Sequence, residues 1–168
     1  MPRTILALAM LAVVAAPTAR GADSWGLENE RTLEVTGKVV DLLCELTGDC
    51  PAGCGAGKRQ LGILTAEGRL LPAVKGTVFF AGAAPDLLPY CGQTVHADGL
   101  LIENPAMTLY FAQYLKAAPD AAWAPTDVYK TQWTAAHGKA EEWWRADPTV
   151  NAVIDRDGPL GIPGLKPE

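Results

Sequence analysis

The chain is poor in serine, and this scarcity excludes a large class of enzymes. Ser24 is its only serine, and it stands in a polar, unpatterned segment, residues 22–30. A Ser/His/Asp hydrolase needs a nucleophilic serine on a strained turn. The sequence therefore argues against a serine hydrolase. Because no other familiar catalytic signature is found, a non-catalytic role is the leading expectation.

Basic clusters are also missing. The chain has 14 Lys and Arg against 19 Asp and Glu, a net charge of −5, and no basic run is longer than Lys58-Arg59. A protein that binds nucleic acid normally needs a basic face that neutralises phosphates. We therefore expect no nucleic-acid partner. An acidic surface would instead suit a basic protein partner, such as a cytochrome.

The chain also lacks an apolar run long enough to cross a membrane, and its longest run fits an export signal better than a membrane anchor. Ile5 to Ala16 is a run of twelve apolar residues that follows Arg3. As a helix it would span about 18 Å, whereas the hydrocarbon core of a bilayer is about 30 Å thick. The pattern predicts a cleavable signal peptide over residues 1–21, cut after Gly21, with the small residue Ala19 at the third position before the cut. We expect a periplasmic or secreted protein with no membrane span after the signal is removed.

Residues 22–104 carry the pattern of a small β-domain, in which short apolar stretches alternate with glycine-containing turns. The expected strands are Thr32–Cys44 with a bend at Gly37, Gln60–Thr65, Arg69–Val74, Thr77–Phe80, and Thr94–Glu103 with an interruption at Asp98-Gly99. A short helical segment is expected over Pro85–Tyr90. Five strands, a long bent first strand and a brief helix fit a small, partly open barrel of the oligonucleotide/oligosaccharide-binding (OB) type. The predicted fold class is α+β, mainly β.

Residues 105–168 are expected to form a helical extension packed on the barrel. Helices are predicted for Met107–Ala118, for Asp127–Ala146, and for a last short segment that Asp147 caps and Pro148 opens. Three tryptophans share one face of the second helix: Trp133, Trp143 and Trp144. We expect them to clamp this helix onto the barrel as core residues. A platform on which a ligand stacks is the alternative.

The four cysteines are the most informative feature: Cys44, Cys50, Cys54 and Cys91. In an exported chain they are expected to form two disulfides, for which three connectivities exist. A bridge from the loop to Cys91 would tie the loop onto the barrel, and a helical turn would make Cys50 and Cys54 neighbours. The alternatives are thiol exchange and a soft-metal site, because thiolates select Cu(I) and Zn(II).

The segment from Cys50 to Cys54, Cys-Pro-Ala-Gly-Cys, resembles the copper-binding loop of the cytochrome oxidase copper chaperones. In that family two thiolates and a distant histidine hold the metal. The resemblance implies a copper site on Cys50 and Cys54 with His96 or His137 as the third ligand, because these are the only two histidines. The thioredoxin-like framework of that family is missing around the loop.

A broader resemblance covers residues 35–103. The stretches Val35 to Cys44, Cys50 to Cys54 and Leu61 to Leu70 resemble a group of uncharacterised exported bacterial proteins. The resemblance implies a small OB-like barrel with a cysteine-bearing first loop. Cys91 departs from the pattern of that group, and the C-terminal helices lie outside the resemblance.

Together these patterns predict a periplasmic, non-catalytic accessory or binding module. Its cysteine loop, centred on Cys50 and Cys54, would bind copper or zinc or support a periplasmic redox partner. The first alternative is a thiol–disulfide oxidoreductase, in which Lys58 and Arg59 would lower the pKa of a thiol. The second alternative is a structural or interaction protein with two inert disulfides.

Overall fold

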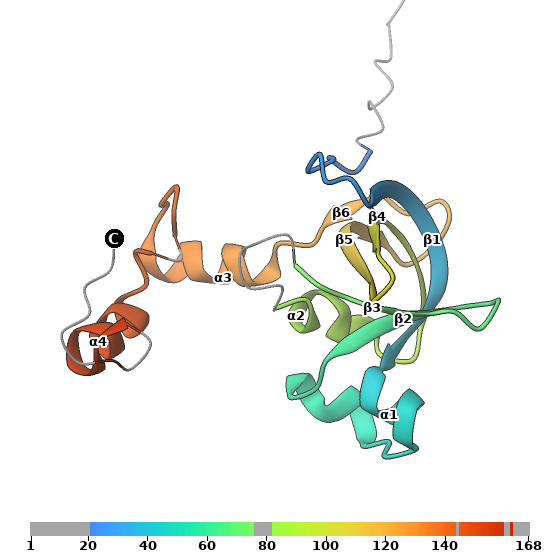
Figure 1. The fold of residues 1–168 in the computed structure, drawn as a ribbon, viewed down its shortest axis with the longest axis horizontal. Coiled ribbons are helices and arrows are strands. Elements are labelled where there is room, and N and C mark those ends of the chain that lie inside the picture. Colours follow the sequence, from blue (N-terminus) through green and yellow to red (C-terminus); the bar gives the residue numbers. More distant parts are fainter. Residues whose placement is uncertain (1–20, 76–81, 144, 160–161, 163–168) are drawn as a thin grey trace, which may run out of the picture.

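The structure is a computed structural model that describes residues 21–75, 82–143, 145–159 and 162. Its centre is one antiparallel sheet of six strands in the order β3-β2-β1-β4-β5-β6. The strands are β1 (Glu30–Asp41), β2 (Leu61–Thr65), β3 (Leu70–Pro72), β4 (Thr94–Glu103), β5 (Thr108–Lys116) and β6 (Ala124–Pro125). Figure 1 shows β1 as a long curved strand that passes from the upper end of the sheet to the lower end.

β1 organises the sheet because it pairs with two different strands along its length. Its residues 30–38 lie opposite β4, and its residues 37–41 lie opposite β2. Gly37 stands where both ladders overlap, and a methyl group there would come within 2.6 Å of the Leu64 carbonyl oxygen. The close approach of the neighbouring strand therefore requires glycine at the position where the sequence predicts a bend.

The core joins side chains of five strands to the short helical segment that precedes β4, which consists of α2 (Ala84–Leu87) and a 3-10 turn, η2 (Leu88–Tyr90). Its largest fully buried side chains are Tyr110, Leu61, Ile63, Leu71, Leu87, Leu100, Leu101, Val39 and Val95. The Tyr110 hydroxyl donates to the Leu33 carbonyl at 2.7 Å and also lies 3.1 Å from the Ala97 carbonyl. Burial raises the pKa of Tyr110, so its hydroxyl keeps its proton.

The segment after β3, at one edge of the sheet, approaches β5 near the other edge next to this core. Ala73, just after β3, forms an isolated parallel bridge with Tyr110 of β5, and the Val74 N–H donates to the Tyr110 carbonyl at 3.0 Å. The described residues thus form a mainly-β α+β fold, as predicted. Their sheet has six strands instead of five and is not closed into a barrel.

Several predicted elements are confirmed. β2 and β3 pair as the expected hairpin, α2 and η2 fill the expected helical segment, and the ladder of β4 shifts register between Asp98 and Gly99. The first strand ends at Asp41 instead of Cys44, because Asp41 caps helix α1, which begins at Leu42. The strand expected over Thr77–Phe80 lies outside the described residues.

The helix predicted for Met107–Ala118 is wrong, because this segment forms β5. Its buried residues Tyr110 and Ala112 alternate along a strand, although the apolar residues also fit a helical spacing. This segment forms hydrogen bonds with the edge of β4, and this tertiary pairing decides between the strand spacing and the helical spacing of its apolar residues. Together with β6, this strand extends the sheet beyond residue 104.

The C-terminal helices are α3 (Val128–His137) and α4 (Pro148–Asp157). α3 ends nine residues before the predicted Ala146, because Gly138 takes a positive φ of 85° and stops the helix. α4 begins as predicted, since the Asp147 side chain accepts hydrogen bonds from the Thr149 and Val150 N–H groups. Figure 1 shows both helices extending away from the sheet. In the described part of the chain, no helix has the length and apolarity needed to cross a membrane.

Candidate functional site

The cysteines pair as two disulfides, Cys44–Cys50 and Cys54–Cys91, with sequence separations of 6 and 37. This is one of the three connectivities that the sequence allowed. The second disulfide ties the loop to Cys91, which directly follows η2 and lies three residues before the start of β4, as expected for a bridge to Cys91. Cys50 and Cys54 belong to different disulfides, and the helical turn that would make them neighbours is not formed, because Cys50 and Pro51 lie outside any helix and Gly53 and Cys54 take left-handed backbone angles. Two disulfides indicate an oxidising environment, extracellular or periplasmic.

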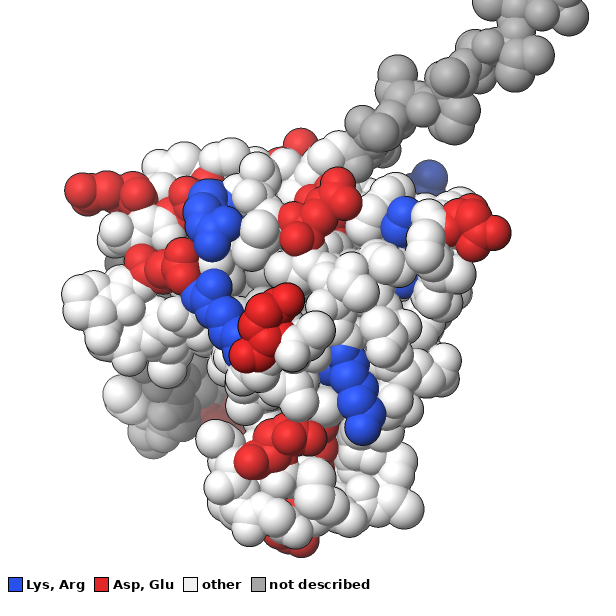
Figure 2. Space-filling view, turned by 90° about the vertical axis from the view of Figure 1, so that its right-hand side faces the viewer, with Lys and Arg blue, Asp and Glu red and all other residues white. Residues whose placement is uncertain are grey.

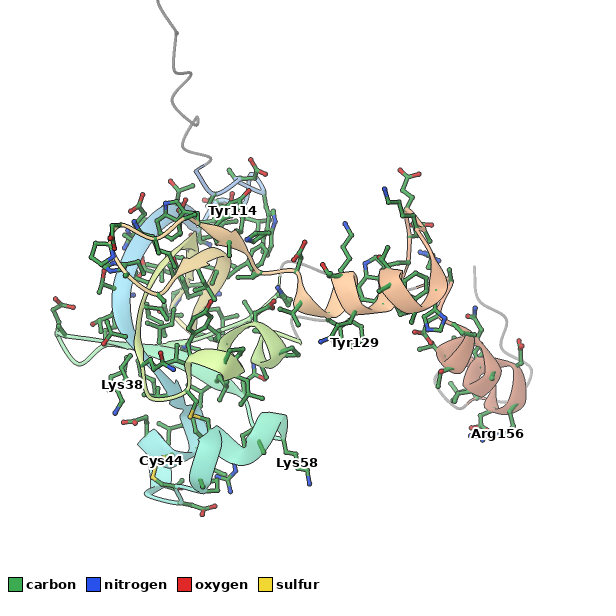
Figure 3. The ribbon with its side chains drawn as sticks, turned by 180° about the vertical axis from the view of Figure 1, so that it is seen from behind. Lys38, Cys44, Lys58, Tyr114, Tyr129 and Arg156 are labelled. Carbon is green, nitrogen blue, oxygen red and sulfur yellow. A yellow bond between two sulfur atoms is a disulfide. The ribbon has the colours of Figure 1, made fainter. Side chains whose placement is uncertain are left out.

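The disulfides enclose a small projection below the sheet, which we call the cysteine lobe (residues 42–59). It consists of helix α1 (Leu42–Thr47) and the left-handed turn η1 (Ala52–Gly57). Figure 3 shows the labelled residues Cys44 and Lys58 in this lobe. The lobe connects β1 to β2 and so takes its position from the centre of the sheet.

Helix α1 is short, and its ends explain why it forms. Asp41 accepts hydrogen bonds from the Leu43 and Cys44 N–H groups, and Gly48 ends the helix in the left-handed conformation. The helix buries none of its residues. Leu43 and Leu46 are 44% and 72% exposed. α1 thus presents apolar side chains to solvent on a backbone that is fixed at both ends.

The turn after α1 runs in the left-handed region for five consecutive residues, from Gly53 to Gly57. Two of these are not glycine: Cys54 has φ 50° and Ala56 has φ 51°. Left-handed backbone costs a residue with a Cβ about 1 kcal/mol or more. Cys54 is nonetheless the buried residue of the turn, and its disulfide to Cys91 holds it against the core.

Arg59, the last residue of the lobe, is held by two acidic residues. Its guanidinium donates to the Asp49 carboxylate at 2.7 Å and to the Asp49 carbonyl at 3.0 Å, and it lies 3.7 Å from Asp41. The hydrogen bond to Asp49 raises the pKa of Arg59. Asp41 is 4% exposed, so Arg59 also supplies the positive charge nearest to a buried carboxylate. The sequence predicts that Arg59 could lower the pKa of a thiol, whereas in the structure Arg59 forms ion pairs with two acids, Asp49 and Asp41.

The oxidation state of its cysteines determines which reactions the lobe can take part in. All four cysteines are disulfide-bonded. Cys50 is exposed and Cys44 half-buried, whereas Cys54 is buried. A thiolate at Cys50 or Cys54 therefore requires prior reduction of a disulfide. Cys44–Cys50 is the bond that an external thiol can reach more easily.

The two histidines proposed as a third metal ligand lie on other elements. His96 is on β4, where its Nδ1 is 2.8 Å from the Thr36 hydroxyl. His137 ends α3, with its ring 5.0 Å from that of Trp133. Figure 3 shows the lobe well separated from α3, which carries the labelled Tyr129. Among the described residues, no group of three or more His, Cys, Asp and Glu side chains is arranged to hold a metal ion.

The predicted tryptophans pack mainly within the C-terminal helical region. Trp133 is buried, donates its indole N–H to Asp147 at 2.6 Å, and lies 5.7 Å from the Trp143 ring. Trp143 is also 5.3 Å from Tyr129. Trp144 lies outside the residues whose side chains are described. Trp133 thus joins α3 to the cap of α4, which is a structural role.

Sequence reasoning missed the contact that attaches α3 to the sheet. Asp86 of α2 is 5% exposed, pairs with Lys75 at 2.5 Å, and accepts a hydrogen bond from the Val128 N–H at 3.0 Å. The Lys75 ammonium also donates to the Thr126 carbonyl. No local pattern could reveal this link, because Asp86 and Val128 are 42 residues apart.

The charges on the surface are mixed. Figure 2 shows acidic and basic side chains interspersed on one face, with large uncharged areas between them. Comparison of the chain with protein-family models, with curated proteins and with solved structures found no match. The function is therefore argued from the chain's own residues.

Proposed function

We propose that this protein is an exported, non-catalytic binding module with an OB-like fold, and that it binds another exported protein through the cysteine lobe. The observation that carries the proposal is the pair of exposed leucines, Leu43 and Leu46, on a helix that a cap, two disulfides and an arginine clamp hold in place. A rigid apolar surface loses little conformational entropy when it is bound.

Three features support the OB-like part of the proposal. β4 returns to lie beside β1, so that the first four strands have the spatial order 4-1-2-3 of a Greek key. The bridge between Ala73 and Tyr110 brings the β3 side of the sheet to β5. A short helical segment, α2 followed by η2, precedes β4, and a brief helix before the last strands is part of the pattern from which the sequence predicts an OB-type barrel. An OB fold is a partly open Greek-key barrel of five strands that serves many kinds of ligand.

The design of the lobe supports a binding role. A chain that had only to connect β1 to β2 could do so with a short turn, because antiparallel strands need few linking residues. Here 19 residues, 42–60, separate Asp41 from Leu61. They are fixed by two disulfides, yet α1 buries none of its residues against the sheet. Rigidity without burial favours a surface that is kept in shape for a partner.

The partner would be a protein with an apolar recess for Leu43 and Leu46. Glu45 stands between these leucines in the sequence, and the lobe also carries the acid Asp49 and the bases Lys58 and Arg59. Since Arg59 is bound to Asp49, Glu45 is the acid beside the leucines with no ion pair among the described residues. A basic residue at the rim of the recess would complement it. This keeps the expected basic periplasmic partner, including a redox protein, within the proposal.

Site-specific photo-crosslinking tests the proposal in the exporting cell. A photo-reactive residue replaces Leu46, and in a control it replaces Met107, which is 57% exposed near the opposite end of β1. We expect a discrete crosslinked protein from position 46 and none from position 107. The double variant Leu43→Ser/Leu46→Ser should bind the purified crosslinked protein at least tenfold more weakly, with unchanged thermal stability. Equal crosslinking from both positions, or none from position 46, would refute a binding role for the lobe.

A second candidate, thiol–disulfide exchange, is favoured by the exposure of Cys50. Attack by an external thiolate on this sulfur would release the Cys44 thiolate and form a mixed disulfide. The variant Cys44→Ser leaves Cys50 free and would trap such a mixed disulfide with its partner. The variant Cys91→Ser leaves the buried Cys54 free and serves as the control. A mixed disulfide formed only through Cys50, together with turnover by the unmodified protein, would replace the binding proposal by exchange chemistry.

Copper or zinc binding stays a prediction for the reduced protein. Reduction of both disulfides would free Cys44, Cys50, Cys54 and Cys91, and only then could thiolates bind a soft metal. Mass spectrometry under native conditions, before and after reduction and with added Cu(I) or Zn(II), tests this. Metal bound to the oxidised protein would contradict the role assigned here to the disulfides.

A further inference from the structure

Asp98 is a buried carboxylate without a cationic side chain. It lies on β4 at the register shift and is 6% exposed. Directly opposite it on β1 stands Glu34. Two acids facing each other across neighbouring strands repel. Burial, followed by this repulsion, raises the pKa of Asp98. Within the described residues, no Lys, Arg or His side chain forms an ion pair with it.

The group that faces Asp98 is a backbone nitrogen. The Ala22 N–H donates to the Asp98 carboxylate at 3.0 Å, across 76 residues of sequence. A second hydrogen bond to this carboxylate comes from the backbone of Gly99. An amide N–H supplies a hydrogen bond but no charge, so the burial of Asp98 is only partly compensated.

Contacts on the following residues hold Ala22 in this place. The Asp23 N–H donates to the Gln113 side chain at 2.9 Å, and the Gln113 amide donates back to the Asp23 carbonyl at 2.7 Å. The Trp25 ring stacks on Phe111 with centroids 5.0 Å apart. Figure 1 shows this segment, in blue, folded onto the upper end of the sheet. Gly21, one residue earlier, is exposed.

The boundary between exposed Gly21 and docked Ala22 coincides with the cut that the sequence predicts. Ala19 and Gly21 are the small residues that a signal peptidase requires at the third and first positions before the scissile bond. Hydrolysis of this bond adds water across it, giving the Gly21 carboxylate and a new amino group on Ala22. An α-amino group has an ordinary pKa of about 7.7–8.0, so it is protonated at neutral pH.

We propose that the chain is processed between Gly21 and Ala22, and that the α-ammonium group of Ala22 then forms an ion pair with Asp98. The cut puts a positive charge on the nitrogen that already lies 3.0 Å from the Asp98 carboxylate. Processing would therefore complete the fold, because the precursor has only an amide at this place. The inference is independent of what the cysteine lobe binds.

The first test uses the full chain, exported by a bacterial host. Its intact mass, read with both disulfides formed, should correspond to a protein that begins at Ala22. A first residue other than Ala22 in the purified protein would overturn the proposed cut. So would a mature form that retains residues before Gly21.

The second test measures the ion pair by a double-mutant cycle on two forms of the protein. One form begins at Ala22, and the other carries two extra glycines before Gly21, so that Ala22 keeps its amide. In the first form, Asp98→Asn should raise the unfolding equilibrium constant about tenfold or more, because a charged hydrogen bond is lost. In the extended form, the same variant should be neutral or stabilising, because it removes the repulsion between Asp98 and Glu34.

The variant Glu34→Gln is the control, because it removes the same repulsion without touching the partner of Ala22. Glu34→Gln should stabilise the extended form. In its presence, Asp98→Asn should still destabilise the form that begins at Ala22. An equal effect of Asp98→Asn in both forms would overturn the ion pair. If the Asp98→Asn protein does not fold, the pKa of the Ala22 amino group, read by NMR in the unmodified protein, decides. A pKa at or below the ordinary range would overturn the pair, and a raised pKa would support it.

Discussion

Cys54 and Cys91 join a left-handed turn to the edge of the core. Cys91 forms an isolated bridge with Val39 of β1, and Val39 is fully buried. The disulfide therefore links the turn η1 of the cysteine lobe to the residue that bridges to β1, while Cys44–Cys50 closes a ring inside the lobe. The two bonds differ in what they constrain, and this difference can be measured.

Loss of the two disulfides should have unequal effects on stability. Closing a loop of 37 residues restricts the unfolded chain more than closing one of 6. The chain-entropy model gives a loss of about 4 kcal/mol for Cys54→Ala/Cys91→Ala and about 2 kcal/mol for Cys44→Ala/Cys50→Ala. Urea unfolding of both double variants checks this order. Equal losses, or a greater loss for the inner ring, would contradict the anchoring role of Cys54–Cys91.

Two glycine substitutions should separate backbone strain from crowding in the left-handed turn. Gly53 and Gly55 both have positive φ, at 59° and 71°. A methyl group on Gly53 meets nothing within 4 Å, whereas one on Gly55 would lie 2.6 Å from the Arg59 side chain. Gly53→Ala should cost about 1 kcal/mol, and Gly55→Ala should cost more because it also displaces Arg59 from Asp49. Chemical unfolding of the two variants gives both values, and a smaller loss for Gly55→Ala would mean that Arg59 moves freely.

Removal of the Asp86 charge should loosen the attachment of α3. Asp86→Ala removes the carboxylate that pairs with the Lys75 ammonium and accepts a hydrogen bond from the Val128 N–H, and the loss of one member of a buried pair costs about 3–5 kcal/mol. Asp86→Asn keeps an acceptor for Val128 and should cost less. Limited proteolysis should cut the Ala variant near residue 127 before the sheet is attacked. If both variants resist cleavage equally, α3 is held by other contacts.

The cap of α4 should weaken in acid. Hydrogen bonds from the Val150 N–H, from the Trp133 indole and from the Thr149 N–H hold the pKa of Asp147 below its ordinary value. A carboxylate whose folded pKa is depressed adds stability above its unfolded pKa, about 3.9, and this stability is lost as the pH falls through the folded pKa. The near-UV circular dichroism of the tryptophans should therefore change below about pH 4. Asp147→Asn should lower the signal at neutral pH and remove this acid-dependent step.

Local chemistry explains which parts of the fold could be predicted from the sequence. The β2–β3 hairpin, the cap of α4 by Asp147 and the irregularity at Asp98-Gly99 depend on residues close together in the chain, so their patterns are visible. The segment of β5 could not be predicted as a strand, because its apolar residues fit both a helical and a strand spacing and only the pairing with β4 decides between them. The predicted helix Asp127–Ala146 is too long because Gly138 takes a positive φ, which ends α3 at His137.

The candidate site was predictable in its residues but not in its connections. The cysteines drew attention to the lobe, yet three pairings were open, and only the fold brings Cys91 to Cys54. The role of Asp41 could have been recognised, because an aspartate directly before an apolar helical segment is a common cap. The pairs of Arg59 with Asp49 and of Asp86 with Val128 depend on the tertiary structure and carry no sequence signal.

Both disulfides join cysteines that are consecutive in the sequence, Cys44 with Cys50 and Cys54 with Cys91. A chain that is synthesised from its N-terminus presents its thiols in this same order. An oxidase that joins each new thiol to the unpaired one before it reaches the native pairing directly, without thiol–disulfide rearrangement. We therefore expect the oxidative maturation of this protein to proceed in cells that lack a disulfide isomerase.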